Sequence, residues 1–328
     1  MTLNNFHDSV KSPFGGIAET LKPKMEDFKV FLLNQAETFE NGVRAAAREA
    51  ISPNGKYIRP MLVFASAPAD ADEKSLVRRA TIAELVHLST LIHDDVIDRA
   101  DMRRNSETAY KKYGAKTAIL LGDAIFSHMM SLAFEENSMA VLKKTADCVR
   151  TVCEGEIKQT LADRAEIVSR EKYYEVAYGK TAALFELACN LGATAGTPPD
   201  GWRDAAENAG KQLGIAYQIY DDICDWFMSE SDAGKTLGTD LISGKQTFPL
   251  IALLEKLPVE QSASLAKNLP NERPEKIAKL MRDFGIPEIC AEEFSRRVAA
   301  AEESLGKFPA VNAGLLEFCS AMRNLKFG

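Results

Sequence analysis

Residues 73–98 read EKSLVRRATIAELVHLSTLIHDDVID, and apolar residues recur in this stretch every three or four positions. That spacing is the period of an α-helix with one apolar face. Alternating, β-branched strand patterns with Asn-Gly turns are missing from the chain. The same helical period recurs in five further segments, 17–39, 115–137, 139–162, 170–191 and 202–227. The sequence therefore predicts an all-α protein built as one large helical bundle.

Breaks between these segments are few. Pro, Gly and short polar residues gather at 52–55, 67–72, 197–201 and 229–244, where turns and loops are expected. Beyond residue 246 we expect shorter helices separated by prolines, at Pro258, Pro270, Pro274, Pro287 and Pro309. Because no repeat or linker divides the 328 residues, we predict a single domain, with a core at about 55–250 and C-terminal helices at about 251–328.

The composition narrows the possible partners. A net charge of −7 disfavours nucleic acid and anionic membrane surfaces, which attract basic proteins. No uninterrupted apolar run reaches the length of a membrane-spanning helix, so we expect no integral membrane span. The six cysteines form no C-x-x-C pair and no basic-then-apolar leader opens the chain, so a cytoplasmic location is expected.

Two acidic clusters share one pattern. Residues 93–104 read HDDVIDRADMRR, and residues 217–225 read YQIYDDICD. Each cluster ends a long, mostly apolar helical segment and contains Asp-Asp-x-x-Asp. One such cluster is as easily a solvated helix end as a binding site, whereas two identical ones favour a common function.

Within each cluster, the first and last carboxylates share one helix face, because helical residues four apart lie almost one above the other. The pairs are Asp94 with Asp98 and Asp221 with Asp225, while Asp95 and Asp222 lie to the side. Such pairs repel each other at a helix end that is already negative. Mg²⁺ reverses that repulsion, since it binds a few carboxylate oxygens, keeps some waters and bridges to phosphate oxygens. Two facing clusters would therefore hold a diphosphate through metal ions.

Basic residues stand near the acidic clusters, as an acidic protein that handles phosphates requires. Arginine offers forked donors to phosphate oxygens, and lysine offers a compact charge. Lys180 is the hardest of them to explain structurally, because its neighbours in the helical segment are apolar. The candidates are Lys56 and Arg59, Arg103 and Arg104, Lys180, and Lys235 and Lys245, which follow glycines in the loop after the second cluster.

Together these residues resemble the trans-prenyl diphosphate synthases, the head-to-tail polyprenyl synthetase family. The likeness runs from about residue 55 to 249 and rests on many motifs in the family's order. They are Gly-Lys-x-x-Arg-Pro at 55–60, the aspartate motifs at 94–98 and 221–225, Gly122-Asp123, Gly155-Glu156-x-x-Gln159, Lys180-Thr181, Gln218, Gly-Lys-x-x-Gly-x-Asp at 234–240 and Gly244-Lys245-x-Thr247-x-Pro249. The chain departs from the family at Asn105, where glycine is usual, and in its weakly basic end.

The resemblance implies a helical bundle of the isoprenoid synthase type with a deep central cavity, and it implies roles for single residues. Three Mg²⁺ ions would bind Asp94, Asp98 and Asp221, with Asp95, Asp222 and Asp225 as further ligands or supports. An allylic diphosphate, farnesyl or similar, would lie on these ions with Arg103, Lys180 and Lys235, and isopentenyl diphosphate would lie on Lys56, Arg59, His87 and Arg104. Lys245 is a further substrate-binding residue. The Thr181 hydroxyl and the Gln218 carbonyl would stabilise an allylic cation. A homodimer is also expected.

The length of the product is predicted from the residues just before Asp94. In the family, an aromatic residue four or five positions before the first aspartate stops the growing chain at farnesyl or geranylgeranyl length. Here Thr90 and Ser89 occupy those positions, and both are small. We therefore predict a medium or long product, hexaprenyl to octaprenyl. Candidates for a deeper floor of the cavity are Phe126, Met129, Met130 and Phe134.

Three alternatives stay open at this point. A short-chain synthase would share every motif. A class I terpene cyclase would share the fold and the first motif, but its second motif usually has Ser and Glu where this chain has Asp225 and Ser229, and it lacks the pair Lys56 and Arg59. A non-catalytic subunit typically loses aspartates, whereas this chain keeps all six.

Overall fold

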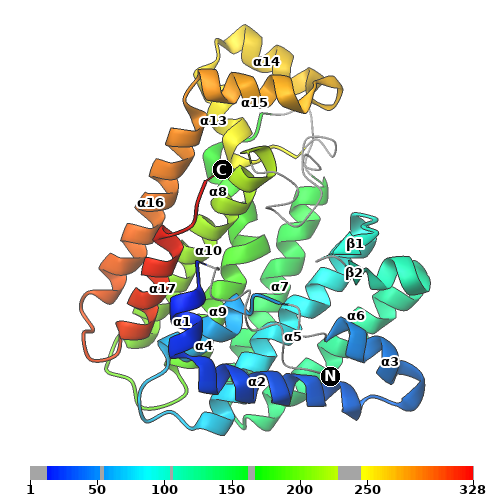
Figure 1. The fold of residues 1–328 in the computed structure, drawn as a ribbon, viewed down its shortest axis with the longest axis vertical. Coiled ribbons are helices and arrows are strands. Elements are labelled where there is room, and N and C mark those ends of the chain that lie inside the picture. Colours follow the sequence, from blue (N-terminus) through cyan, green and yellow to red (C-terminus); the bar gives the residue numbers. More distant parts are fainter. Residues whose placement is uncertain (1–12, 52–54, 104–105, 162–166, 228–244, 328) are drawn as a thin grey trace.

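The structure is a computed structural model of the chain, and it describes residues 13–51, 55–103, 106–161, 167–227 and 245–327. Within these ranges the protein is helical, as the sequence predicts. The exception among the described residues is a small antiparallel hairpin, β1 (Met102–Arg103) with β2 (Ser106–Glu107). The hairpin directly follows the first aspartate cluster (Figure 1).

The helices of the first half, in chain order, are α1 (Gly15–Thr20), α2 (Lys22–Gln35), the 3₁₀ turn η3 (Ala36–Thr38), α3 (Asn41–Ala50), α4 (Ile58–Ser66), α5 (Glu73–Ile97), α6 (Ala109–Glu135) and α7 (Met139–Leu161). Those of the second half are α8 (Arg170–Ala177), the π-helical turn η4 (Tyr178–Ala182), α9 (Ala183–Ala193), α10 (Trp202–Phe227), α13 (Phe248–Lys256), α14 (Val259–Asn268), the 3₁₀ turn η5 (Leu269–Asn271), α15 (Pro274–Asp283), α16 (Ile286–Leu305) and α17 (Ala313–Arg323).

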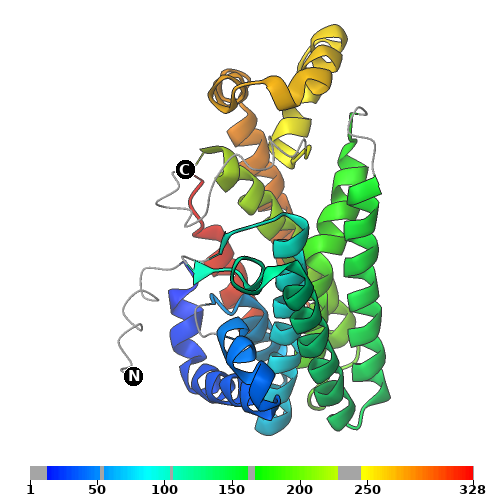
Figure 2. The ribbon, with the colours of Figure 1, turned by 90° about the vertical axis from the view of Figure 1, so that its right-hand side faces the viewer.

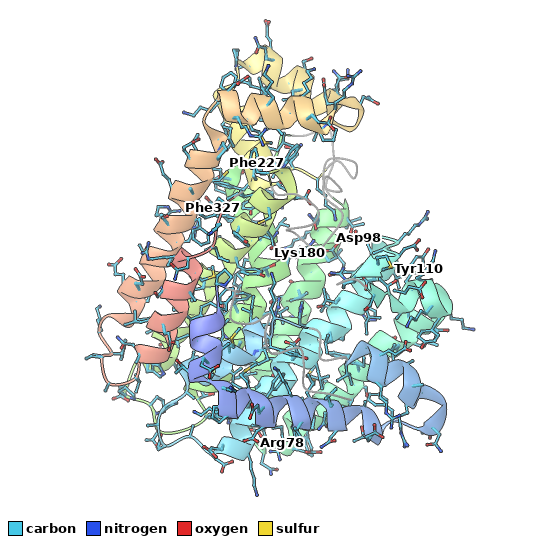
Figure 3. The ribbon with its side chains drawn as sticks, in the orientation of Figure 1. Arg78, Asp98, Tyr110, Lys180, Phe227 and Phe327 are labelled. Atoms are coloured by element: carbon cyan, nitrogen blue, oxygen red, sulfur yellow. The ribbon has the colours of Figure 1, made fainter. Side chains whose placement is uncertain are left out.

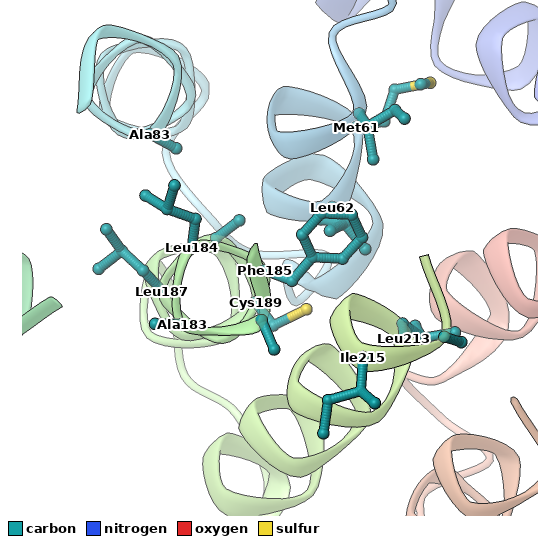
Figure 4. Packing of buried hydrophobic residues seen from close by; sticks show 14 of the residues in the cluster. Met61, Leu62, Ala83, Ala183, Leu184, Phe185, Leu187, Cys189, Leu213 and Ile215 are labelled. Atoms are coloured by element: carbon teal, nitrogen blue, oxygen red, sulfur yellow. The ribbon is translucent and has the colours of Figure 1, made fainter. Parts of the chain in front are cut away.

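The core of the bundle lies around α9. Every residue of this helix except Glu186 is buried, which is expected of a helix that is apolar on all sides. It packs against α4, α5 and α10, and α10 packs in turn against α16. Figure 4 shows this contact, with Leu62 of α4, Phe185 of α9 and Leu213 of α10 filling the space between the helices.

The two ends of the bundle differ. Figures 1 and 2 show α2 and α3 lying across one end, while α14 and α15 cover the other. Helices α5 and α10 run in the same direction along the bundle. In Figure 3, Arg78 near the start of α5 lies far from Asp98 at its end, and Phe227 marks the end of α10. The aspartate clusters lie near the ends of these two helices, and residues of both line one cleft.

The predicted boundaries agree with the structure in most places. The segment expected from residue 115 begins at a kink within α6, where Gly114 has φ 78° and ψ 164°, a conformation that glycine adopts readily. The prediction of short helices after residue 246 is wrong for α16, which has 20 residues. Pro287 lies in its first turn, where a missing N–H breaks no helical hydrogen bond, so the proline starts this helix and does not divide it.

Helix α6 is the one described helix that is long and apolar enough to cross a membrane by length and composition. About 39% of the apolar window is buried inside the protein, where α6 packs along α5. Core helices of soluble proteins pass the same test, so its composition is weak support for a membrane span.

Candidate active site

A cleft with a volume of about 320 Å³ lies between the ends of α5 and α10, the turn η4 and the start of α4. It is lined by thirteen of the residues predicted to act, and these come from four separate parts of the chain. They are Lys56, Arg59, His87, Thr90, Asp94, Asp98, Arg103, Lys180, Thr181, Gln218, Asp221, Asp222 and Asp225.

One face of α5 forms a wall of this cleft. Glu84, His87, Leu91, Asp94 and Asp98 follow each other at steps of three and four, and all five line the cleft. Residues at these steps share one face of a helix. Two of them were not predicted: Glu84, which is 2% exposed, and Leu91. The regular spacing from the first aspartate backward is a signal that identifies both.

Asp94 is held in a position that disfavours its charge. Burial is the main reason why its pKa is raised to about 6, and Lys180 opposes this shift while the carboxylates of Glu156 and Asp98 add to it. An aspartate surrounded in this way gains from a nearby cation. The arrangement therefore fits a divalent metal ion, which would relieve the repulsion among the three carboxylates.

Asp95 faces away from the cleft. It is 5% exposed, and its Oδ1 accepts a hydrogen bond of 2.6 Å from Nε of Arg103. Arg103 belongs to β1 and itself lines the cleft. Asp95 therefore holds Arg103 at the cleft.

Asp222 also has protein partners on both carboxylate oxygens. Oδ1 accepts from Nε2 of Gln218 at 2.8 Å, and Oδ2 accepts from the Tyr173 hydroxyl at 2.7 Å and from N of Phe248 at 3.2 Å. A carboxylate only accepts hydrogen bonds, so the Gln218 amide must turn its NH₂ toward Asp222. Its carbonyl then accepts the Thr181 hydroxyl at 2.6 Å.

Lys180 and Thr181 reach the cleft because the helix is locally widened. Both lie in the π-helical turn η4 between α8 and α9, and such turns occur often at functional sites. The turn is pressed against its neighbours. A Cβ on Gly179 would lie 3.0 Å from Cα of Gly155 on α7, and a Cβ on Gly214 of α10 would lie 2.4 Å from Cα of Ala182. Glycine at these positions lets the backbones meet and fixes the turn.

Basic residues approach the cleft from two further segments. Lys56 and Arg59 flank Tyr57, a residue with a left-handed backbone (φ 51°) that precedes the first turn of α4. The Arg59 guanidinium lies over the ring of Phe185 at 5.6 Å. Nζ of Lys245 lies 3.4 Å from Oδ1 of Asp98, so this lysine is paired with the first cluster. Arg104 and Lys235 lie outside the described residues.

The residues predicted to set product length divide into two groups. Thr90 lines the cleft, whereas Ser89 is 3% exposed, is not among the lining residues and donates its hydroxyl to the Val86 carbonyl. Among the candidates for the floor, Met129 is buried and Phe126 and Met130 are half-buried. Phe134 is 70% exposed, so this residue cannot close an internal cavity and its prediction is wrong.

The described residues contain no preformed group of three or more His, Cys, Asp or Glu side chains that could hold a metal ion by themselves. Mg²⁺ does not require one, because it is commonly held by one or two carboxylates together with waters and substrate phosphates. The oxygen-only donor set at the ends of α5 and α10 suits that ion and does not suit zinc.

The chain is similar to known proteins over most of its length. Residues 40–284 match the Polyprenyl synthetase family. The all-trans-nonaprenyl-diphosphate synthase (geranyl-diphosphate specific) of Rhodobacter capsulatus is 28% identical over 81% of this chain and 83% of its own. The octaprenyl diphosphate synthase of Escherichia coli (strain K12) is 35% identical over 65% of this chain and 66% of its own.

Solved structures agree with these relatives. A polyprenyl synthase from Caulobacter crescentus CB15, complexed with calcium and isoprenyl diphosphate, superposes with a TM-score of 0.85 at 27% identity, over 95% of this chain and 97% of that one. A decaprenyl diphosphate synthase from Rhodobacter capsulatus superposes with a TM-score of 0.81 at 27% identity, over 94% and 99%. With its helical fold, its paired aspartate clusters and these likenesses, the chain belongs to the polyprenyl synthetase family of transferases.

Proposed function

We propose that this transferase joins isopentenyl diphosphate head-to-tail to an allylic diphosphate, farnesyl diphosphate or a similar primer, and makes an all-trans polyprenyl diphosphate. The observation that carries the proposal is one cleft that is lined by residues of both aspartate clusters and Lys180 and also by Lys56, Arg59 and His87. A reaction of two diphosphate substrates needs two sets of groups that bind a diphosphate.

The aspartate side of the cleft suits the allylic substrate. Asp94, Asp98 and Asp221 would hold three Mg²⁺ ions, which when bound neutralise diphosphate oxygens and draw electrons from the breaking C–O bond. Lys180 and Arg103 donate to the departing diphosphate. Thr181, whose hydroxyl is oriented by Gln218, offers a neutral oxygen to the cation without adding a charged nucleophile. Calcium in the Caulobacter crescentus enzyme supports a divalent ion in this fold.

The basic side of the cleft suits isopentenyl diphosphate. Lys56, Arg59 and His87 bind its diphosphate, so that its double bond faces the allylic carbon. The double bond attacks the cation and forms the new C–C bond, and the adjacent carbon then loses a proton to the released diphosphate. This assignment leaves no step that needs a dedicated side-chain base.

Labelled isopentenyl diphosphate separates this activity from the alternatives. We expect purified protein with farnesyl diphosphate and Mg²⁺ to incorporate the label into longer diphosphates, and we expect chelation of the metal to stop incorporation until Mg²⁺ is restored. A terpene cyclase would consume farnesyl diphosphate and leave the label untouched. A non-catalytic subunit would do neither.

The relatives named nonaprenyl, octaprenyl and solanesyl diphosphate synthase support the medium- or long-chain trans-prenyltransferase activity that the sequence predicts. We attribute this product length to the small side chains of Ser89 and Thr90. A phenylalanine at either position fills space one turn before Asp94, and one turn rises about 5.4 Å, close to one isoprene unit.

We expect Ser89→Phe and Thr90→Phe to shift the product to farnesyl or geranylgeranyl length, measured by chromatography of the dephosphorylated alcohols. Thr90 lines the cleft, whereas Ser89 is buried. Thr90→Phe should therefore shorten the product with a smaller loss of stability than Ser89→Phe. Ser264→Phe, at an exposed position on α14, is the matched control and should leave the product unchanged. An unaltered product from both gate variants refutes the proposed gate.

We also propose that the protein is a homodimer. Large apolar side chains are exposed along α6 and α7, where they suit a homodimer interface: Ile119, Leu120, Phe134, Met139, Ile157 and Leu161. Light scattering of the purified protein tests this.

All six cysteines are free thiols, which supports a reducing, cytoplasmic location.

A further inference from the structure

We infer that Tyr173 is a positioning residue for the reaction, acting through a chain of hydrogen bonds from Tyr173 to Asp222, Gln218 and Thr181. This inference rests on the function proposed above. Tyr173 lies on α8 and is 6% exposed, and it does not line the cleft. Its effect therefore has to pass through the residues that do.

The first link is the bond between the Tyr173 hydroxyl and Oδ2 of Asp222, which is 2.7 Å long. A carboxylate only accepts hydrogen bonds, so the Tyr173 hydroxyl is the donor in this pair. A hydrogen bond to a buried, charged acceptor is among the stronger kinds in proteins.

The second link fixes Asp222 from another direction. N of Phe248, the first residue of α13, donates to the same Oδ2 at 3.2 Å. This N–H has no partner within its own helix, and it lies at the positive end of the helix dipole. Asp222 thus caps α13, and the Tyr173 ring packs against the Phe248 ring with a centroid distance of 5.4 Å. Tyrosine, carboxylate and helix start hold one another in place.

The third link connects Asp222 to the residues that line the cleft. Oδ1 of Asp222 accepts a hydrogen bond of 2.8 Å from the Gln218 amide and so orients it. The Gln218 carbonyl then accepts a hydrogen bond of 2.6 Å from the Thr181 hydroxyl and orients that group. Without the Tyr173 hydroxyl, Oδ2 of Asp222 loses a hydrogen bond of 2.7 Å and keeps a longer one of 3.2 Å from N of Phe248, so the carboxylate is held less firmly. The Gln218 amide, and through it the Thr181 hydroxyl, are then oriented less firmly as well.

The test uses Tyr173→Phe, which removes one hydroxyl and keeps the ring against Phe248. Tyr174→Phe is a matched control on the same helix, because the Tyr174 hydroxyl donates to another carboxylate, Glu293 of α16, at 2.8 Å. We expect Tyr173→Phe to lower kcat by about ten- to a hundredfold, the loss typical of a hydrogen bond to a charged group. We expect KM for isopentenyl diphosphate to change less than threefold, and Tyr174→Phe to keep wild-type kcat.

A double-variant cycle separates positioning from a merely structural role. Gln218→Ala breaks the chain between Asp222 and Thr181, so Tyr173→Phe should lower kcat less than twofold further when it is added to Gln218→Ala. Multiplicative losses in the double variant overturn the proposal, as does an equal kcat for the two tyrosine variants. If Tyr173→Phe does not fold, a wild-type kcat for Gln218→Ala overturns it as well.

A crystal structure of Tyr173→Phe gives a readout that does not depend on turnover. We expect the Asp222 carboxylate or the Gln218 amide to take a new orientation there and to keep the native one in Tyr174→Phe. Native orientations of both in Tyr173→Phe contradict the inference. Absence of isopentenyl incorporation by the wild-type protein would instead contradict the proposed function, and the crystal structures would still decide whether Tyr173 orients the chain.

Discussion

Replacing Asp94 with asparagine should abolish turnover and, at the same time, make the metal-free protein more stable. Turnover should fall on the order of 10³-fold or more, because the variant loses a metal-binding carboxylate that the departing diphosphate depends on. Stability should rise because burial and the carboxylates of Glu156 and Asp98 disfavour the charge on Asp94, and asparagine carries none.

The pH dependence follows from the raised pKa. Asp94 titrates at about 6 in the folded chain against an ordinary 3.8, so the folded state binds this proton more tightly than the unfolded state. The Asp94 contribution therefore lowers the free energy of unfolding as the pH rises from about 4 to about 6, and the loss is complete above that window. It amounts to about 3 kcal/mol, which is also the largest gain that Asp94→Asn can give at neutral pH.

The measurement is thermal unfolding without metal, of both proteins, from pH 4 to pH 8, with activity assayed alongside. We expect the difference in Tm between variant and wild type to grow up to about pH 6 and then to level off. Asp70→Asn is the control, since hydrogen bonds from Thr197 lower the pKa of that exposed aspartate. It should gain no stability and stay active. A fully active Asp94→Asn would rule out the assigned role.

Replacing Lys180 with methionine should lower kcat by about 10²- to 10³-fold, the usual effect of removing one group that stabilises developing charge. Methionine keeps the apolar stem and removes the ammonium. Because Lys180 lowers the pKa of Asp94, its loss should also raise that pKa. Metal binding by the variant should therefore require a higher pH, since the ligand must be deprotonated.

A second lysine beside the same turn provides the comparison. Nζ of Lys211 lies 5.2 Å from the centre of the Tyr178 ring, and Lys211 does not line the cleft. Lys211→Met should keep wild-type kcat. A Lys180→Met enzyme that keeps more than about a third of wild-type kcat at saturating Mg²⁺ would contradict the role assigned to Lys180.

The long helices were predictable because apolar residues recur in their sequences at steps of three and four over many turns. The segments predicted at 73–98 and 202–227 correspond to α5 and α10 almost residue for residue. Helix α4 gave no such signal, because nearly all its residues are buried and a fully apolar run has no period to detect. The hairpin β1–β2, with two residues in each strand, is too short for alternation to show.

The site was predictable where its residues lie in short motifs. What the sequence could not supply are the bonds between distant segments, such as Tyr173 with Asp222, 49 residues apart, and Lys245 with Asp98, 147 residues apart. These depend on how the helices pack. The different surroundings of the aspartates follow from the same cause: Asp95 accepts from Arg103 and does not line the cleft, whereas Asp222 accepts from Gln218 and Tyr173 and lines it.

The most direct test of the account is the length of the product. Purified protein is incubated with farnesyl diphosphate, labelled isopentenyl diphosphate and Mg²⁺, and the dephosphorylated alcohols are separated by length and double-bond geometry. The account predicts labelled, all-trans products of hexaprenyl to octaprenyl length, and none when the metal is chelated. A labelled product that stops at geranylgeranyl length, or a cyclised hydrocarbon without label, would contradict it.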